Sequence, residues 1–259
     1  MIQSRGIYIS LSGGLGNQMM QLYAANKLAM HFDQVIYISL AWFKKSHINK
    51  RITQRDFELG CFTLGCQYEE INLSRWNYFI LNLVCTRVRS KSKFENLLRK
   101  KKQKKSIYLN YHFADIKIDH FEFKRLFKWN EEEISNELVE LRKKILNSGS
   151  PALFIRKDDW VTLSPESVVN ERCFEQNLER RHENKYFIVG QIGKDLLEFE
   201  KLKVLSMFID DCGKGWSSYE KMYLLSASAY LYSSKSTYGR CALYLTKKGE
   251  GKIILPCSL

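Results

Sequence analysis

The chain has 259 residues, a mass of 30.5 kDa and an apolar fraction of 45%, with only 3 Pro and 14 Gly. This composition excludes collagen-like, disordered and Pro-rich proteins, and the length is enough for one large domain or two small ones. No apolar run reaches the roughly 18 residues that cross a bilayer, and the first residues lack the charged and apolar regions of a signal peptide. We therefore expect a soluble, cytoplasmic protein that is not exported.

The cysteines and histidines show no metal-binding spacing. Because nothing in the sequence points to an oxidising compartment, we interpret the seven cysteines as reduced thiols of the core. Cys61 and Cys66 are close enough to meet in a hairpin, but the same reasoning disfavours a disulfide between them. No Asp-x-Asp pair ends a predicted strand either, so we expect a site without metal. The residues concerned are Cys61, Cys66, Cys85, Cys173, Cys212, Cys241, Cys257, His31, His47, His112, His120 and His182.

Positive charge is concentrated in one segment. The chain carries 41 Lys and Arg against 28 Asp and Glu, a net charge of +13, and the segment 89–105 alone has nine basic residues and one acid. Contact with anionic lipid head groups or phosphates is one interpretation, at about 1 kcal/mol per charge near an acidic membrane. A solvated helix face and loop is another. Nucleic acid is a third, which the lack of zinc-finger, RNP-type and basic-zipper patterns disfavours.

The first forty residues have the pattern of one βαβ unit. Residues 7–11 form an apolar run typical of a buried strand, and a glycine-rich turn follows at residues 12–18. Apolar residues then recur at helical spacing as far as His31, and residues 34–40 predict the next strand. Strand, glycine turn, helix and strand in this order predict a parallel sheet.

The middle of the chain is less regular. Residues 41–127 show no sustained period, and within them we expect helices in the range 71–103 and a short strand at 107–109. Asn130, followed by three Glu, is predicted to cap a helix whose apolar stripe ends at Ile145.

The turn at residues 147–151 is the best candidate for a domain boundary. It divides the chain into an N-terminal α/β domain, residues 1–148, which contains the basic segment 89–105, and a C-terminal α/β domain, residues 149–259. Beyond the turn, strands and helices alternate as in a doubly wound fold. The expected strands are 152–155, 186–189, 203–209, 230–232 and 253–255, and the expected helices are 193–201, 218–226 and 237–245.

The glycine turn is the first candidate site. Its glycines, Gly14 and Gly16 among them, allow the backbone to approach a ligand closely, and the start of the helix offers N–H donors. The turn is neither a dinucleotide fingerprint nor a P-loop. Asn17 and Gln18 favour a ligand-binding site over a bare glycine turn, because two amides at a helix start suit sugar hydroxyls or an oxygen that gains charge. The alternative is that Asn17 caps the helix and Gln18 lies on its surface.

Two more candidate sites follow strands of the C-terminal half. After the strand 230–232, hydroxyls and a Lys at a helix start form a phosphate cradle, unless Ser236 or Thr237 simply caps that helix. After the strand 152–155, an arginine can bind a pyrophosphate through two N–H groups and a lysine adds a point charge, unless the charges form a surface ion-pair cluster. The charged residues are Arg156, Lys157, Asp158 and Asp159.

These segments, in this order, resemble glycosyltransferase family 11, the α-1,2-fucosyltransferases, and more loosely the wider fucosyltransferases that share an H-x-R-R motif. The resemblance is collinear over essentially the whole chain. The family's G-G-L-G-N-Q-M-F-Q-Y-A is similar to residues 13–24, and its R-x-F-x-L-x-x-F to residues 55–62. Its H-x-R-R-G-D-Y resembles residues 154–160, and its terminal run S-N-S-T-F-S-W-W-A-A resembles residues 234–243.

The resemblance implies a GT-B-like fold, two Rossmann-like domains facing a cleft. It implies GDP-fucose as the donor and an inverting, metal-independent transfer of L-fucose to the 2-hydroxyl of a galactoside. Bacterial members of the family build surface polysaccharides, such as O-antigen or capsule, on lipid carriers at the cytoplasmic face of the inner membrane. Such a setting would suit contact between the basic segment 89–105 and an anionic membrane, and nucleic acid is not an expected partner.

The resemblance also assigns roles to residues. Arg156 would neutralise the pyrophosphate of the departing GDP, and Asn17 would lie near the reacting centre; both are the expected catalytic residues. Gln18 and Arg55 would bind the acceptor. The donor would contact Gly14, Gly16, Arg156, Lys157, Asp159, Ser236, Thr237 and Tyr238, with Asp159 orienting the loop.

Several motif positions depart from the family pattern. Phe154 stands in place of the motif His, Lys157 in place of the second Arg and Asp158 in place of the Gly. The family's F-S-D-D has become residues 189–192, with both acids lost, and Lys235 replaces an Asn. Two alternatives therefore stay open: a transferase that uses another nucleotide sugar, and a catalytically weak protein of the same pathway that binds sugar nucleotides.

Overall fold

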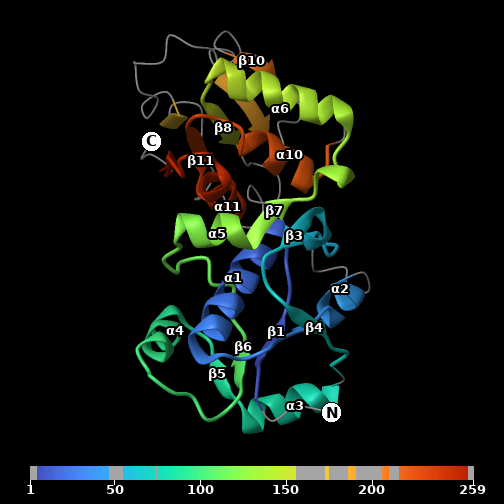
Figure 1. Cartoon of the computed structure of the whole chain (residues 1–259), viewed down its shortest axis with the longest axis vertical. Coiled ribbons are helices and arrows are strands. Elements are labelled where there is room, and N and C mark those ends of the chain that lie inside the picture. Colours follow the sequence, from blue (N-terminus) through green and yellow to red (C-terminus); the bar gives the residue numbers. More distant parts are fainter. Residues whose placement is uncertain are drawn as a thin grey trace. The chain divides into compact units, whose positions relative to one another are not determined.

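The structure is a computed structural model that describes residues 5–46, 55–73, 75–155, 173–174, 186–190, 206–209 and 216–255. The chain divides into two compact units, Met1–Lys128 and Trp129–Leu259, and each is built around a five-stranded sheet (Figure 1). None of the described helices combines the length and apolar composition that crossing a membrane requires.

The sheet of the N-terminal unit is parallel throughout and has the order β4-β2-β1-β6-β5. The expected strands 7–11, 34–40 and 107–109 are confirmed as its three central strands, which are apolar and buried because both faces of the sheet are covered. The strands are β1 (Ile7–Ser10), β2 (Ile36–Ser39), β4 (Tyr68–Glu70), β5 (Thr86–Val88) and β6 (Ile107–Leu109).

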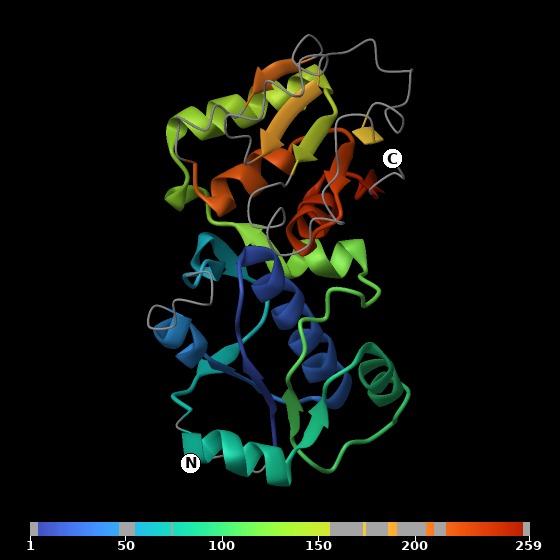
Figure 2. The ribbon, with the colours of Figure 1, turned by 180° about the vertical axis from the view of Figure 1, so that it is seen from behind.

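A row of three tyrosines covers one face of this sheet. Tyr8 lies level with Tyr37 on one side and with Tyr108 on the other, and the rings of Tyr8 and Tyr37 stack with centroids 4.9 Å apart. Leu81 and Cys85, at the end of helix α3 (Arg75–Val84), pack against this row. Isoleucines of the same strands alternate to the opposite face, where α1 (Leu15–Phe32) packs along the sheet (Figures 1 and 2).

The remaining elements of this unit are short. The helices expected within residues 71–103 are α3 and α4, but a strand, β5, separates them because Thr86–Val88 pairs with β6. The sequence did not predict the two-stranded sheet β3-β7 or the helices α2 and α5. Their bounds are α2 (Ala41–Ser46), a 3-10 turn η1 (Leu59–Cys61), β3 (Phe62–Leu64), α4 (Lys91–Leu98), α5 (His120–Leu126) and β7 (Phe127–Trp129).

The C-terminal unit repeats the doubly wound plan, with the parallel order β10-β9-β8-β11-β12. All five expected strands are present within a few residues of their expected bounds, and so are two expected helices. The third expected helix, 193–201, lies outside the described residues. The elements are β8 (Ala152–Ile155), β9 (Tyr186–Gly190), β10 (Ser206–Ile209), α10 (Ser218–Leu225), β11 (Leu231–Ser234), α11 (Thr237–Leu245) and β12 (Gly251–Ile254).

Helix α6 (Asn136–Ser148) belongs to the C-terminal unit, so the units divide after Lys128 and not at the turn after residue 148. The reason is Arg142, whose Nη1 donates to the Tyr223 carbonyl and, at 2.6 Å, to Ser226 Oγ at the end of α10. Its guanidinium also lies 4.3 Å from the centroid of the Tyr223 ring. A half-buried cation with these partners ties α6 to α10.

The expected cap of α6 is also corrected. Asn130 precedes a 3-10 turn, η2 (Glu131–Glu133), without a hydrogen bond from its side chain. Ser135 caps the helix instead and accepts from Leu138 N at 3.4 Å, while Gly149, with a φ of 63°, ends it in the left-handed conformation.

Among the five cysteines that the structure describes, the expectation of reduced thiols holds for four and fails for one; Cys212 and Cys257 lie outside the described residues. Cys61, Cys66, Cys85 and Cys241 are free, which confirms that Cys61 and Cys66 do not pair. Burial raises the pKa of Cys61 to about 12 and that of Cys66 to about 11, so both thiols are protonated and unreactive at neutral pH. Cys173, however, is disulfide-bonded.

Candidate functional site

Each sheet has a switch point beside its first strand. In the N-terminal unit the chain moves from β1 outward to β2 and β4 and then returns to the other side of β1 as β5 and β6. In the C-terminal unit it moves from β8 to β9 and β10 and returns as β11 and β12. Open α/β sheets bind ligands outside the carboxyl ends of the strands at such points. The ends of β1 and β6, and of β8 and β11, are therefore the candidate sites.

The glycine turn lies at the first switch point, directly after β1. Gly13 has a φ of +75°, and a Cβ built on it would lie 2.7 Å from Asn17 Nδ2, so glycine is required there. Asn17 is half-buried in the first turn of α1, and its side-chain amide makes no hydrogen bond within the described part of the chain. The Arg55 side chain passes beside Gly14, whose added Cβ would be 3.8 Å from Arg55 Nε. The structure thus brings Gly14, Asn17 and Arg55 together.

Gln18 holds this turn together and does not reach solvent. Its side chain is fully buried, and Nε2 donates to the carbonyls of Gly13 at 2.9 Å and Asp56 at 2.8 Å. Its Oε1 accepts from Glu58 N at 3.0 Å. Both amide hydrogens and the amide oxygen are thus engaged with backbone, which corrects the role of Gln18 from an acceptor-binding to a positioning residue.

Substitution of Gln18 by Met, which keeps the size of the side chain, is expected to lower the free energy of unfolding by about 2–3 kcal/mol. It would leave two carbonyls and one N–H group buried without partners, at roughly 1–3 kcal/mol each before relaxation. Urea denaturation followed by circular dichroism measures the change. Asn26→Met, on the same helix, is the control, because the one hydrogen bond of the Asn26 amide among the described residues goes to Met30 Sδ. Equal stability of wild type and Gln18→Met would contradict this role.

Glu58 is a second residue that holds the turn in place, and no role was predicted for it. Its Oε2 accepts from Leu15 N at 3.0 Å, so a carboxylate occupies the first free N–H of α1. Burial raises the pKa of Glu58, while the bond from Leu15 and the charge of Arg55 act in the opposite direction. The one signal for Glu58 in the sequence was its position within residues 55–62, which resemble the family motif R-x-F-x-L-x-x-F.

His112 follows β6 and lies at the same switch point. The register of β1 and β6 pairs Ile9 with Leu109, and continued by three residues it places Ser12 level with His112. Gln21 joins these two residues, since its Nε2 bonds Ser12 Oγ at 3.0 Å and His112 Nδ1 at 3.2 Å.

The hydrogen bonds of Gln21 determine which nitrogen of His112 carries the proton. Ser12 N donates to Gln21 Oε1 at 3.0 Å, so the amide nitrogen of Gln21 must face His112 as a donor. Nδ1 of His112 then accepts, and Nε2 carries the proton of the neutral ring. Burial lowers the pKa of His112, which favours this neutral form at pH 7. His112 therefore presents an N–H donor, not a base, at the edge of the sheet.

Backbone strain accompanies this histidine. Phe113, the next residue, is fully buried and has a φ of 58°. The left-handed conformation is costly for a bulky residue, by about 1–3 kcal/mol, and such residues concentrate at functional sites. Packing of the Phe113 ring against Phe94 and Tyr111 holds it in place.

The second switch point is formed by β8, β11 and the start of α11. Ser236 caps α11 and accepts from Gly239 N at 2.9 Å, so the predicted alternative of a helix cap is confirmed for it. Its hydroxyl hydrogen has no acceptor within the described part of the chain. Thr237 is half-buried in the first turn, and Lys235 is exposed just before it.

Tyr238 has a structural role. Its hydroxyl donates to the Ser218 carbonyl at 2.5 Å, and its ring packs on Phe154 with centroids 4.9 Å apart. Contact of Tyr238 with the donor stays a prediction, since the side chain is half-buried and these two contacts do not test it. They also explain Phe154, which stands in place of the motif His: it is a buried core residue at the end of β8.

Gly239 brings α11 close to β11. A Cβ on this residue would lie 1.8 Å from Ser233 Oγ and 3.1 Å from Phe154 Cδ1. Only glycine allows the helix to start this close to the strand, as does the third glycine of dinucleotide-binding turns.

The charged residues after β8 are not placed by the structure. Arg156, Lys157 and Asp159 lie outside the described residues, and β8 ends at Ile155, one residue before them. Within the part of the chain that is described, no three His, Cys, Asp or Glu residues cluster in a way that could hold a metal ion.

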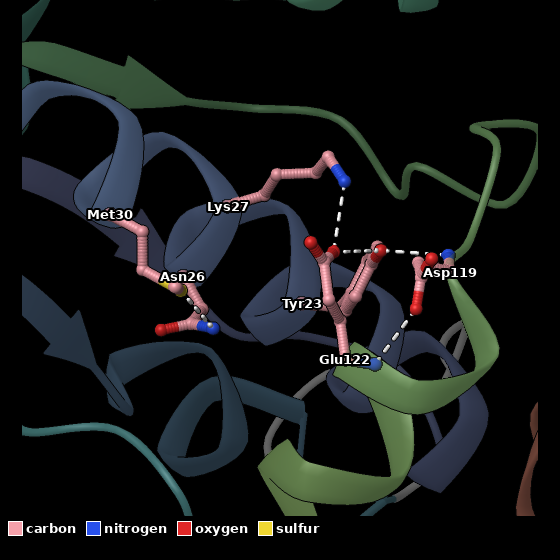
Figure 3. A network of polar contacts seen from close by, with 6 residues as sticks. All are labelled: Tyr23, Asn26, Lys27, Met30, Asp119 and Glu122. Atoms are coloured by element: carbon pink, nitrogen blue, oxygen red, sulfur yellow. Dashed lines mark hydrogen bonds and ion pairs between the residues drawn. The ribbon is translucent and has the colours of Figure 1, made fainter.

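A second polar cluster on α1 is structural as well (Figure 3). Tyr23 Oη accepts from Asp119 N and donates to Glu122 Oε2, both at 2.9 Å, and Lys27 Nζ lies 2.9 Å from the same carboxylate oxygen. This network fixes α5 to α1. Next to it, an open groove of about 880 Å³ runs past the amino ends of β2 and β4, at the edge of the sheet opposite to the glycine turn.

Comparison with solved structures identifies the fold. The fucosyltransferase NodZ from Bradyrhizobium matches with a TM-score of 0.58 and 15% identity over 94% of both chains. NodZ α-1,6-fucosyltransferase co-crystallized with GDP matches with a TM-score of 0.59 and 15% identity, over 94% of this chain and 93% of that one. POFUT1 in complex with GDP-fucose gives 0.53 and 10% identity over 97% of both chains. The chain has the fold of GT-B fucosyltransferases.

The fold predicted from the sequence is thereby confirmed. No protein-family model matches the chain, and no curated protein matches it in sequence. Membership of glycosyltransferase family 11 stays a prediction.

Proposed function

We propose that the protein is a glycosyltransferase that transfers L-fucose from GDP-fucose to a sugar hydroxyl. The fold likeness to NodZ and POFUT1, over more than nine tenths of every chain compared, is the observation that carries this proposal. Two of these structures hold GDP and GDP-fucose, respectively. The glycine turn at residues 13–18 follows β1, and Ser236 and Thr237 follow β11, so these motif residues lie at the carboxyl ends of strands beside the switch points.

In this proposal the donor binds at the carboxyl ends of β8 and β11. Ser236 donates its hydroxyl hydrogen and Thr237 adds a second hydroxyl at the start of α11, where the helix favours a phosphate. Arg156 follows β8 directly and supplies the positive charge that the pyrophosphate needs, with Lys157 and Asp159 beside it in sequence. No metal ion takes part.

The chemistry of the transfer is electrostatic. The bond between fucose C1 and the β-phosphate oxygen breaks, the pyrophosphate gains negative charge, and the sugar becomes electron-poor. A positioned guanidinium stabilises that charge more in the transition state than in the bound donor, which accelerates the reaction. The acceptor oxygen then bonds to C1 from the opposite face, with inversion, and its proton passes to solvent or to a nearby base.

The acceptor binds beside the glycine turn in this proposal. Asn17 offers an amide at the start of α1, Arg55 passes beside Gly14, and His112 offers an Nε2–H donor at the end of β6. Amides and N–H donors of this kind suit the hydroxyls of a sugar. On the motif resemblance we propose the 2-hydroxyl of a galactoside in a surface polysaccharide, made on a lipid carrier at the cytoplasmic face of the inner membrane.

Substitution of His112 by Ala is expected to raise the KM for the acceptor by roughly three- to tenfold, the effect of one lost neutral hydrogen bond, with a smaller change in kcat. The dissociation constant of GDP should not change. Steady-state kinetics with varied acceptor measures the effect. His31→Ala, which removes an exposed ring bonded to the Lys100 carbonyl, is the matched control. An unchanged KM in His112→Ala would remove this residue from the acceptor site.

Calorimetric titration with GDP, GDP-fucose and UDP-sugars tests the donor. Binding of GDP and GDP-fucose, with fucose transferred or released over time, supports the proposal. A preference for a UDP-sugar identifies a transferase for another donor, and tight binding of GDP-fucose without turnover identifies a sugar-nucleotide binding protein.

A further inference from the structure

The helix α3 exposes an apolar face. Phe79, Ile80, Leu83 and Val84 have 55%, 39%, 68% and 51% of their surfaces exposed, and their spacing places them on one side of the helix. The other side carries Leu81, which packs into the tyrosine row of the sheet. Contiguous apolar side chains on a surface mark an interaction site.

A cationic segment lies next to the end of this helix. Residues 99–105 contain six exposed basic side chains and no acid: Arg99, Lys100, Lys101, Lys102, Lys104 and Lys105. Gln103, in the middle of the segment, donates from Nε2 to Thr86 Oγ1 at 2.8 Å, and Thr86 N donates to the Ser106 carbonyl at 2.8 Å. Thr86 follows Val84 by two residues, which span at most about 7 Å.

The backbone of this cationic segment is fixed while its side chains extend into solvent. His31 Nε2 donates to the Lys100 carbonyl at 2.8 Å, and Lys100 N donates to the Leu97 carbonyl at 2.9 Å. Together with the bonds of Gln103 and Thr86, these contacts hold both ends and the middle of the segment against the unit. Figures 1 and 2 show that α3 and the connection from α4 to β6 reach the same end of the N-terminal unit.

We propose that the apolar face of α3 and the cationic segment 99–105 together dock on an anionic lipid bilayer. Leu83 and Val84 enter the boundary between head groups and acyl chains, and the lysines contact the anionic head groups. An apolar face flanked by cations has the composition of a membrane-surface helix. A bilayer accounts for both features of this surface, because its acyl boundary buries the apolar side chains and its anionic head groups pair with the cations.

The position of the surface keeps the candidate site accessible. The cationic segment leads into the amino end of β6, and α3 leads into the amino end of β5, whereas the glycine turn follows the carboxyl end of β1. Parallel strands place all amino ends at one edge of the sheet. Docking at that edge leaves the opposite edge, with Asn17 and His112, free, so the inference does not depend on the proposed transferase activity.

Co-flotation with vesicles tests the proposal on the full chain. The vesicles are phosphatidylcholine alone or phosphatidylcholine mixed with phosphatidylglycerol. Wild type should float with the mixed vesicles only, and two variants should each bind them at least about tenfold more weakly. One is Leu83→Gln with Val84→Gln, and the other changes five lysines to Gln: Lys100, Lys101, Lys102, Lys104 and Lys105. The control removes the same charge elsewhere, by Gln substitution at Lys117, Lys128, Lys144, Lys247 and Lys248.

One outcome supports the proposal and four overturn it, with circular dichroism melting to confirm that all variants fold. Weakened binding in both test variants and wild-type binding in the control support the proposal. Equal binding by all four proteins overturns it, as does loss of binding in the lysine variant alone. Binding to an RNA hairpin without binding to any vesicle also overturns it and identifies a nucleic-acid surface. A concentration-dependent dimer that the Leu83→Gln, Val84→Gln variant abolishes, without vesicle binding, overturns it in favour of a second copy of the chain.

Discussion

Substitution of Gly239 by Ala is expected to lower the free energy of unfolding of the C-terminal unit by about 3 kcal/mol. This value is at the upper end of the range of about 1–3 kcal/mol that is typical when a side chain is enlarged in a packed core. The added Cβ would lie 1.8 Å from Ser233 Oγ and 3.1 Å from Phe154 Cδ1, in a place where the helix and the strand are both buried. The start of α11 must then move away from β11, which also displaces Ser236 and Thr237. Thermal and urea denaturation measure the loss, and GDP titration measures the displacement.

Two further variants make this result specific. Gly60→Ala is the control, because a Cβ there meets nothing within 4 Å and the stability should change by less than about 0.5 kcal/mol. Ser233→Ala combined with Gly239→Ala removes the oxygen in closest contact and should recover part of the loss. If Gly239→Ala were as stable as wild type, the close packing of α11 on β11 would be wrong.

Substitution of Arg156 by Ala is expected to reduce kcat by about 10²-fold or more, the scale for removal of one group that stabilises transition-state charge. The reason is the charge that the GDP pyrophosphate gains as the bond to fucose breaks. Arg156→Lys keeps the charge but not the two parallel N–H donors, so its kcat should lie between those of wild type and Arg156→Ala. Initial rates of GDP release with saturating acceptor measure these effects.

The control for this prediction is Arg89→Ala, which removes an exposed arginine of the N-terminal unit. It should leave kcat and the KM for GDP-fucose unchanged. Wild-type kinetics in Arg156→Ala would contradict the assignment of the pyrophosphate to this residue, whereas a large loss in Arg89→Ala would show that net charge alone governs the rate.

The strands were predictable where burial on both faces makes them apolar. Residues 7–11, 107–109 and 152–155 are such runs, and the structure has strands at all three within one residue of the expected ends. The short edge strand β5 was not predictable. It contains Thr86 and Arg87, and only its pairing with β6 makes it a strand. The unit boundary failed for a similar reason, because the contacts of Arg142 with Tyr223 and Ser226 join residues more than eighty positions apart.

The segments that form the candidate site could be predicted from sequence motifs, but the role of each side chain in them could not. Glycines and amides directly after a strand pointed to the turn at residues 13–18, and the structure places it at a switch point. The pattern could not show that Gln18 faces inward, since a glutamine at a helix start suits either a ligand or the backbone of residues 56–58. His112 had no motif of its own. Its importance arises from the pairing of β6 with β1, which three residues of strand sequence do not reveal.

Product analysis with GDP-fucose and a panel of galactosides tests the central proposal most directly. Mass spectrometry should show an acceptor that has gained one deoxyhexose residue, in an amount equal to the GDP released and without added metal. Nuclear magnetic resonance of that product would establish the linkage and whether the anomeric configuration is inverted. The proposed fucosyl transfer is contradicted if no acceptor gains mass with GDP-fucose while the protein transfers a sugar from a UDP donor, or if the protein binds GDP-fucose without transferring fucose.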